Sequence, residues 1–449
     1  MADKLLIRLF DVGLGDCIYC RIPKAHKDGR DFHILIDCGT LSSTDYLSDA
    51  IKHLKALLPL IGGKRHVDLL VVTHEHKDHM TGFGMKLWDG MSFGAIWMSA
   101  AMDLNHPEAK RAKKLHAFAA GAMQQALRLN LALGPQLTEL AAAVALNKTA
   151  MTTLRETLPK KNKIKATYVH SQSSKKDLAL PLKGATVSVL GPEKDIDFYY
   201  LGRPGDPSLR RALGLIDSGL PDPATAVPND KNIPAPTNID PAEFRQLRSR
   251  MLSTALAFAD LDGKVCNNTS VVLLIVWKGR RLLFVGDAEW DGAFKKGTKA
   301  NCSWNVMWNL RKKQLDGPLA FYKIGHHGSV NATPWGQTPV ARSGEPLAIL
   351  DAILPVKSKA KAAAIVSTRR GNYPTIPRTD LLAEIGGRVS NTRNYADAFT
   401  KALKKTSEVP QFAEYERKSF AKPQPRRTDL ERMLVDSKPF VDVEIDSPH

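Results

Sequence analysis

The sequence has no hydrophobic run long enough to cross a membrane. Its longest apolar run, Val271 to Trp277, has the length of a strand, whereas a membrane-spanning helix needs about 20 apolar residues. The first eight residues hold only a short apolar stretch before a Gly/Asp-rich motif, which is not the pattern of a signal peptide. We therefore expect a protein without membrane spans.

Cysteine is also scarce. The five cysteines are an odd number without a secretory context, so we expect reduced thiols and a cytoplasmic location. Cys17 and Cys20 form a single CxxC on a predicted strand, where their side chains would face opposite sides of the sheet. Because no second CxxC follows, we assign this pair no zinc or redox role.

Acidic residues are fewer than basic residues. The 449 residues include 46 Asp and Glu against 64 Lys and Arg, giving a formal charge of +18. This excess favours an anionic partner such as nucleic acid or an acidic membrane surface, although a merely solvated basic face is the alternative. The basic residues gather in five segments, which are Lys110–Lys114, Lys160–Lys165, Lys278–Arg281, Lys295–Lys299 and Arg311–Lys313.

Periodicity and turn residues predict an alternation of strands and helices. We expect strands over residues 5–10, 17–22, 33–36, 67–72, 95–98, 164–170, 185–190, 271–277, 282–285, 321–324 and 363–367, and helices over 45–58, 85–88 and 242–259. The length suits one large domain with insertions or two domains.

The stretch from Val71 to Gly82 carries the strongest chemical signal, because a buried strand runs directly into His74, His76, Asp78 and His79. Loops beyond the carboxyl ends of strands are where α/β proteins bind ligands. Three imidazoles and a carboxylate are poor core material, and a solvated polar loop is the alternative. Imidazole with carboxylate suits Zn²⁺, with Mn²⁺ or Fe as substitutes, and the absence of cysteine argues against a closed structural zinc site.

The segment His74-Glu75-His76-Lys77-Asp78-His79 resembles the HxHxDH signature of the metallo-β-lactamase fold. The resemblance implies an αββα sandwich with two Zn²⁺ ions, Mn²⁺ being an alternative. His74 and His76 would bind the first ion, and Asp78 and His79 the second. His170, at a predicted strand end, is the candidate for a third ligand of the first ion.

The N-terminal motifs sharpen this resemblance. Asp11-Val12-Gly13-Leu14-Gly15-Asp16 and Leu35-Ile36-Asp37-Cys38-Gly39 are similar to the "DVGQGD … LIDxG" opening of the ComEC-type branch, which includes the hydrolase domain of bacterial DNA-uptake proteins. Leu14 replaces the usual Gln. The resemblance implies that Asp37 accepts the ring N–H of a metal-binding histidine, and we expect Asp11 and Asp16 to brace the neighbouring loops.

Two motifs in the second half complete the expected ligand set. The segments Asn267–Ser270 and Gly286–Glu289 match "N.TS … LLxTGDAE", which implies that Asp287 bridges the two ions and that Glu289 supports it. Lys323–Ser329 looks like "KxxHHGS". We expect His327 to bind the second ion, and His326 to be a further ligand or a transition-state contact. Ser329 and Asn331 are candidate donors to a substrate oxygen.

The domain organisation follows from the same resemblance. We expect a hydrolase domain over residues 1–400, with a helical insertion at about 105–162 and an irregular loop at about 203–240. The insertion would be a substrate cap, a surface for a homodimer or another partner, or a passive decoration. Residues 401–449 read as a basic C-terminal extension, with a helix and a loosely packed tail.

These inferences predict a metal-dependent phosphodiesterase that cleaves DNA or RNA, with Asp78, Asp287 and His326 as its catalytic residues. Two ions bridged by Asp287 would ionise a water molecule near neutral pH. One alternative is a hydrolase of a small ester, lactam or nucleotide. The other is a nucleic-acid-binding or interaction protein with a vestigial metal site. Ile376 stands where the family often has a histidine, which speaks against a simple transfer of activity.

Overall fold

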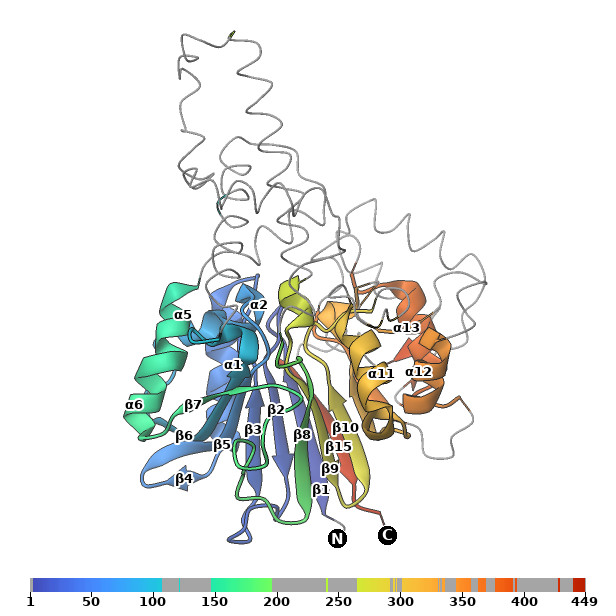
Figure 1. Ribbon diagram of the computed structural model, residues 1–449. Helices are drawn as coiled ribbons and strands as arrows, with labels where there is room; N and C mark the ends of the chain where they lie inside the picture. Colours follow the sequence, from blue (N-terminus) through green and yellow to red (C-terminus); the bar gives the residue numbers. More distant parts are fainter. Residues whose placement is uncertain are drawn as a thin grey trace, which may run out of the picture.

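The computed structural model describes residues 3–106, 121, 147–195, 240, 265–290, 294, 296, 301–329, 331, 333–335, 345–356, 362–368, 376–390, 392–393, 427–428 and 439–448. In these ranges the chain is a mixed α/β protein with two large sheets (Figure 1). The predicted α/β class is therefore confirmed. No helix among these residues is both long and apolar enough to cross a bilayer.

The first sheet has the strand order β15-β1-β2-β3-β5-β6-β7, with β4 paired to β5. Pairs from β15 to β3 are antiparallel, and pairs from β3 to β7 are parallel. Its strands are β1 (Lys4–Phe10), β2 (Ile18–Ile22), β3 (Phe32–Ile36), β4 (Leu60–Ile61), β5 (Lys64–Val72), β6 (Met91–Ser99), β7 (Ala166–Val169) and β15 (Phe440–Asp446).

The second sheet has the order β12-β11-β10-β9-β8. The pairs of β10, β11 and β12 are parallel, whereas β8, β9 and β10 pair antiparallel. Its strands are β8 (Ala185–Gly191), β9 (Val272–Trp277), β10 (Arg280–Phe284), β11 (Phe321–Lys323) and β12 (Ala363–Ile365), and a separate small pair joins β13 (Thr392–Arg393) to β14 (Arg427–Thr428).

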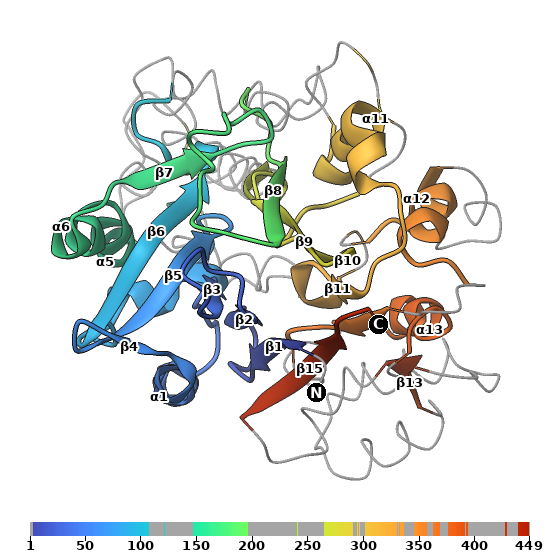
Figure 2. The same cartoon turned by 90° about the horizontal axis from the view of Figure 1, so that it is seen from below.

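Helices cover the outer faces of the two sheets, as Figure 2 shows from below. One flank carries α1 (Thr44–Leu57), α5 (Lys148–Thr152), the π-helix η3 (Thr153–Thr157) and α6 (Leu158–Asn162), and the other carries α11 (Ser303–Leu315), α12 (Glu345–Ile353) and α13 (Thr379–Gly386). Short turns near the site are α2 (Lys77–Met80), η1 (Thr81–Gly84), η2 (Ala100–Met102) and η4 (His326–Gly328).

The period-2 pattern of β5 places its side chains in two different cores. Leu69 and Val71 pack between the sheets, whereas Leu70 and Val72 pack beneath α1. A strand buried on both faces needs a continuous apolar run, which is what this sequence provides. Both faces are thus covered, so the polar residues that follow Val72 emerge at the end of a rigid strand.

The sequence explains where helix α1 begins, which face it buries and where it ends. The Ser43 side chain caps the helix by accepting a hydrogen bond from the Asp45 N–H at 3.2 Å. Leu47, Ile51 and Leu54 are buried on one face, and burying each such side chain stabilises the fold by about 2 kcal/mol. The helix ends just before Pro59, which cannot donate a backbone hydrogen bond.

Most predicted elements in the described ranges are present, with shifts of a few residues at their ends. The predicted helix over residues 85–88 is wrong, because these residues form a bend and a turn. Several predictions concern residues outside the described ranges. They are most of the insertion (residues 107–120 and 122–146), the loop at 203–239, the helix at 242–259 and the boundary near residue 400.

The prediction of a loosely packed tail is wrong for the last residues. Strand β15 pairs along its whole length with β1, from Lys4 opposite Asp446 to Phe10 opposite Phe440. Alternate residues of β15, such as Val441 and Ile445, are buried against the core between the sheets. The end of the chain is therefore an edge strand of the first sheet.

Candidate metal centre

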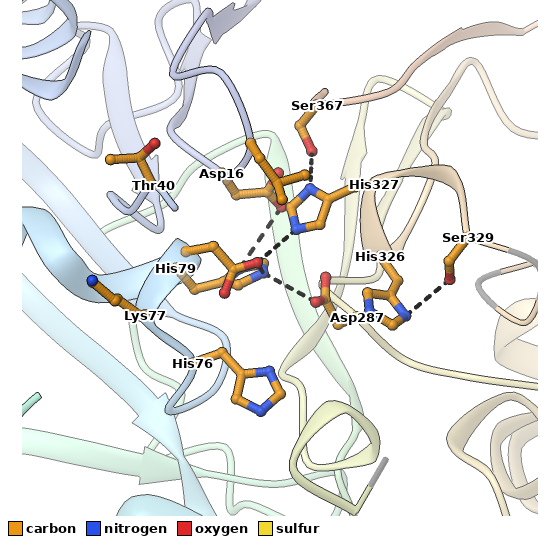
Figure 3. Close-up of polar contacts among 12 residues, drawn as sticks. Asp16, Thr40, His76, Lys77, His79, Asp287, His326, His327, Ser329 and Ser367 are labelled. Carbon is orange, nitrogen blue, oxygen red and sulfur yellow. Dashed lines mark hydrogen bonds and ion pairs between the residues drawn. The ribbon is translucent and has the colours of Figure 1, made fainter. Parts of the chain in front are cut away.

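The carboxyl ends of four strands meet at one end of the molecule, and the candidate site residues follow them directly. Asp37 comes after β3, His74 after β5, Asp287 after β10, and His326 and His327 after β11. Because parallel strands of one sheet end at the same edge, segments far apart in the sequence converge here. Figure 3 shows the histidine and aspartate side chains pointing toward one another.

Two groups of potential metal donors share one carboxylate. The first donor group consists of His74, His76 and Asp287, and the second donor group consists of Asp78, His79, Asp287 and His327. The donor atoms of each group lie within 4.8 Å of one another, and all of these residues are buried. The structure thus brings together all six predicted metal ligands, with Asp287 between the two groups.

Short distances define the interior of the site. The Nε2 atom of His79 lies 3.2 Å from Oδ2 of Asp287, and Nε2 of His74 lies 3.6 Å from the same oxygen. The Nε2 atom of His327 lies 2.8 Å from Oδ2 of Asp78. These atoms therefore face a common space from both sheets.

The imidazoles are oriented from behind by oxygen atoms. Nδ1 of His79 lies 2.8 Å from Oδ2 of Asp37, and the Thr73 N–H and Oγ1–H donate to the two oxygens of that carboxylate at 2.7 Å. Nδ1 of His327 lies 3.2 Å from Oγ of Ser367. Such contacts fix the ring and its tautomer, leaving Nε2 toward the metal position. The position predicted for Asp37 is thus observed.

Three hydroxyl side chains in this layer were not predicted from the sequence. Oγ of Ser270 lies 3.3 Å from Nδ1 of His74 and accepts the Asp287 N–H at 3.0 Å. Thr73 and Ser367 are the other two hydroxyls that contact these rings. Serine and threonine carry little chemical signal alone, but their places directly beside the motifs could have marked them.

The other predicted residues occupy distinct places. Asp16 joins Asp37 beside His79, whereas Asp11 braces its own turn by accepting the Gly13 N–H at 3.1 Å. His170 joins neither donor group of the described residues. Its Nδ1 instead accepts a hydrogen bond from the Gln172 N–H at 3.1 Å.

His326 lies at the rim with Ser329 and Asn331. Its Nδ1 is 2.9 Å from Oγ of Ser329, which donates to Oδ1 of Asn331 at 2.8 Å. Glu289 approaches the same ring at 3.6 Å and accepts hydrogen bonds from Asn267 and Asn268. The side chain of His326 is 20% exposed, whereas that of His327 is 1% exposed, so His326 is the histidine that a substrate could touch.

The charge balance inside the site depends on the histidines. Burial alone would raise the pKa of Asp287, but His79 and His326 hold that pKa well below its usual range. Burial alone would lower the pKa of His79, yet the carboxylates of Asp287 and Asp78 raise it well above the usual value. Burial lowers the pKa of His74. The site thus requires positive charge, which protons on histidine provide and a divalent cation would also provide.

Unpaired polar atoms support the same interpretation. Oδ1 of Asp78 and Oδ1 of Asp287 are buried and form no hydrogen bond with any described residue, and Oδ2 of Asp287 and Nε2 of His79 face each other as an ion pair at 3.2 Å. Leaving such atoms unpaired is costly. All of them point into the donor groups, so the residues fit a bound metal ion. Their chemistry, nitrogen and carboxylate oxygen, suits Zn²⁺ or Mn²⁺.

The basic segments lie elsewhere. The turn of Lys278–Arg281 follows β9, whose first residue, Val272, lies two residues after Ser270 of the site. The strand runs away from the site, and Lys278 pairs with Asp3 at 3.0 Å. Lys160–Lys165 precedes β7, at the opposite end of the first sheet, and Arg311–Lys313 lies in the far half of α11. Lys110–Lys114 and Lys295–Lys299 lie outside the described residues, except for Lys296.

Comparison with known proteins adds no relative. No family model matches the sequence, and no curated protein matches it.

Proposed function

We propose that this protein is a metal-dependent hydrolase with the metallo-β-lactamase fold, similar to the ComEC-type branch. The observation that carries the proposal is the sharing of Asp287 between two buried donor groups that come from both sheets. The arrangement of two facing sheets with helices outside them supports it. So does the set of histidine and aspartate donors, in which six residues match the resemblance and His170 does not.

Each residue of the site has a task in such a reaction. His74, His76 and Asp287 would hold one cation, and Asp78, His79, Asp287 and His327 would hold another. Divalent cations make water acidic at neutral pH and offset negative charge that develops on a substrate. His326 lies at the rim, where it would contact the substrate, and Ser329 fixes its ring through Nδ1.

We further propose a phosphodiester substrate, namely DNA or RNA. The formal charge of +18 and the resemblance to a DNA-uptake hydrolase support this choice, since phosphate contacts dominate nucleic-acid affinity. A cytoplasmic location belongs to the same proposal.

The test is to load the full chain with Zn²⁺ or Mn²⁺ and incubate it with single- and double-stranded DNA and RNA and with bis(4-nitrophenyl) phosphate. We expect cleavage by the wild type and a loss of more than about 100-fold in His76→Ala and Asp287→Ala, because even a residue that only orients a ligand costs 10–100-fold. Glu75→Ala is the matched control, since Glu75 lies in the same loop but belongs to neither donor group.

One observation favours a second candidate, a hydrolase of a small ester, lactam or nucleotide. Three of the five basic segments lie away from the donor groups, where they could not contact phosphates of a strand bound at the site. Cleavage of a small ester or nucleotide without cleavage of polynucleotide would establish this candidate. Binding of polynucleotide without any hydrolysis, unchanged in Asp78→Ala, would instead indicate a binding protein with a vestigial site.

A further inference from the structure

A fully buried lysine joins the two sheets directly behind the second donor group. Lys323 is the last residue of β11, and its Nζ donates to Oδ2 of Asp16 at 2.8 Å. Both side chains are 1% exposed. Asp16 belongs to the turn between β1 and β2 of the first sheet, so this ion pair spans the interface between the sheets.

Asp16 in turn grips the backbone that carries two metal donors. Its N–H donates to the carbonyl oxygen of Asp78 at 2.9 Å, and its own carbonyl oxygen accepts the Gly39 N–H at 2.9 Å. Its Oδ2 lies 3.9 Å from Nδ1 of His79, and Asp16 lies beside His79 and His327 in Figure 3. The position of Asp16 therefore sets the position of the Asp78–His79 segment.

Lys323 is tied in the same way to the remaining donor. Only three residues separate it from His327, and the intervening chain is anchored by the Ile324 N–H, which donates to the carbonyl oxygen of Ile365 at 2.8 Å. Across the space between the sheets, Nε2 of His327 meets Oδ2 of Asp78 at 2.8 Å. The Lys323–Asp16 ion pair and the His327–Asp78 contact thus join the same two segments of chain, one from each sheet.

Stability alone does not account for such a pair. Removing two charges from water costs several kcal/mol per ion, and apolar residues of similar volume often serve stability as well or better. An ion pair does, however, fix direction and register between the groups it joins. Moreover, Oδ1 of Asp16 forms no hydrogen bond with any described residue, so Lys323 is the main partner of this carboxylate.

We propose that Lys323 is a positioning residue of the second donor group, which it sets in register through Asp16 so that Asp78 and His79 of one sheet and His327 of the other reach the same ion. This inference rests on the proposed function, because it assumes a metal centre.

The test is a Zn²⁺ titration of the full chain against a chromophoric chelator, comparing wild type with Lys323→Met. We expect the second ion to bind about 10–100-fold more weakly in the variant, with the first ion bound as before. The visible absorption spectrum of the Co²⁺-loaded variant should also change for the second ion only. A Lys323→Met protein that binds two ions as tightly as the wild type would overturn the proposal.

Arg30→Met is the matched control for a purely structural effect. Arg30 pairs with the buried carboxylate of Asp68 in the middle of β5, away from the donor groups. Its loss also removes the cation that pairs with a buried carboxylate, so we expect lower stability but unchanged binding of both ions. Weakened binding of the second ion in this control to the same degree would contradict a specific role for Lys323.

The double variant Asp16→Asn/Lys323→Met separates position from charge, and it also serves if Lys323→Met alone does not fold. It leaves no unpaired buried charge, so stability should recover while the second ion remains weakly bound. Recovery of both would overturn the inference. A wild type that binds no ion at all would instead refute the proposed function itself, so the two failures are distinguishable.

Discussion

Three residues of the site have a left-handed backbone that side chains seldom adopt. The φ angles are 56° at Asp37, 41° at His326 and 50° at His327. Each such conformation costs on the order of 1–3 kcal/mol and persists only where the surrounding contacts enforce it. His327 is a candidate metal donor, Asp37 contacts the candidate donor His79, and His326 lies at the rim of the site. The strain is therefore concentrated where these side chains must be oriented.

The absence of a side chain at Gly39 allows the backbone of Asp78 and His79 to pack directly against it. A Cβ atom on Gly39 would fall 2.3 Å from the carbonyl carbon of Asp78 and 2.4 Å from the nitrogen of His79. We predict that Gly39→Ala lowers the free energy of unfolding by about 2–3 kcal/mol and weakens Zn²⁺ binding, as urea unfolding and metal titration would measure.

Gly84→Ala is the control for this substitution. Its Cβ would meet nothing closer than 3.6 Å, so its effect on the free energy of unfolding should stay within about 0.5 kcal/mol. If both substitutions lowered the free energy of unfolding equally, the close backbone packing at Gly39 would not be important for stability.

At the scale of single elements, the pairing of β2 with β3 contains a buried histidine. Nδ1 of His33 lies 2.8 Å from the Tyr19 hydroxyl, and burial lowers the pKa of His33 from 6.5 to about 4. The unfolded chain therefore takes up this proton at a higher pH than the folded protein. Consequently, stability is lost as the pH falls from about 6.5 to about 4, by about 3 kcal/mol in total.

We predict that His33→Gln makes the free energy of unfolding less dependent on pH in this window. Urea unfolding at pH 7 and at pH 4.5 would measure the difference between wild type and variant. If the two proteins lose the same amount of stability between these pH values, His33 is not the responsible group.

The sequence predicted the elements where a motif coincided with a clear pattern. Strand β5, with the histidines after it, was found because an apolar run changes abruptly into imidazoles and carboxylates. The short helix expected at residues 85–88 failed, since four residues hold too little periodicity to distinguish a helix from a turn. Strand β15 was missed because alternating Val and acidic residues in a polar tail carry a weak signal.

The candidate metal donors were largely predictable from the sequence, whereas the residues that orient these donors were not. Motif resemblance pointed to all six donors, from His74 to His327. In contrast, Lys323 acts through a contact between the two sheets, whereas Thr73 and Ser367 act through contacts between neighbouring strand ends of one sheet. Both kinds of contact depend on packing between segments distant in sequence. A single sequence does not reveal that register.

At the scale of the whole molecule, strand β15 near the end of the sequence pairs with strand β1 near its beginning. Arg8 of β1 pairs with Asp442 at 2.7 Å and lies 3.5 Å from the centre of the Phe440 ring. We predict that deleting residues 440–449 lowers the Tm by roughly 5–10 °C and promotes aggregation, because β1 becomes an exposed edge strand. Thermal unfolding and light scattering would measure both effects.

Glu444→Gln is the control for this deletion. It removes only the exposed ion pair between Lys4 and Glu444 and should leave the Tm nearly unchanged, since exposed pairs contribute little. A truncated protein as stable as this variant would show that β15 is dispensable.

The most direct test of the metal centre is the number of ions bound per chain. The full-length protein, purified, exposed to Zn²⁺ and then dialysed, should contain two ions per chain by elemental analysis. Asp287→Ala should contain at most one, because this carboxylate belongs to both donor groups. A wild-type protein that retains no ion, or an Asp287→Ala protein that retains two, would contradict the dinuclear centre.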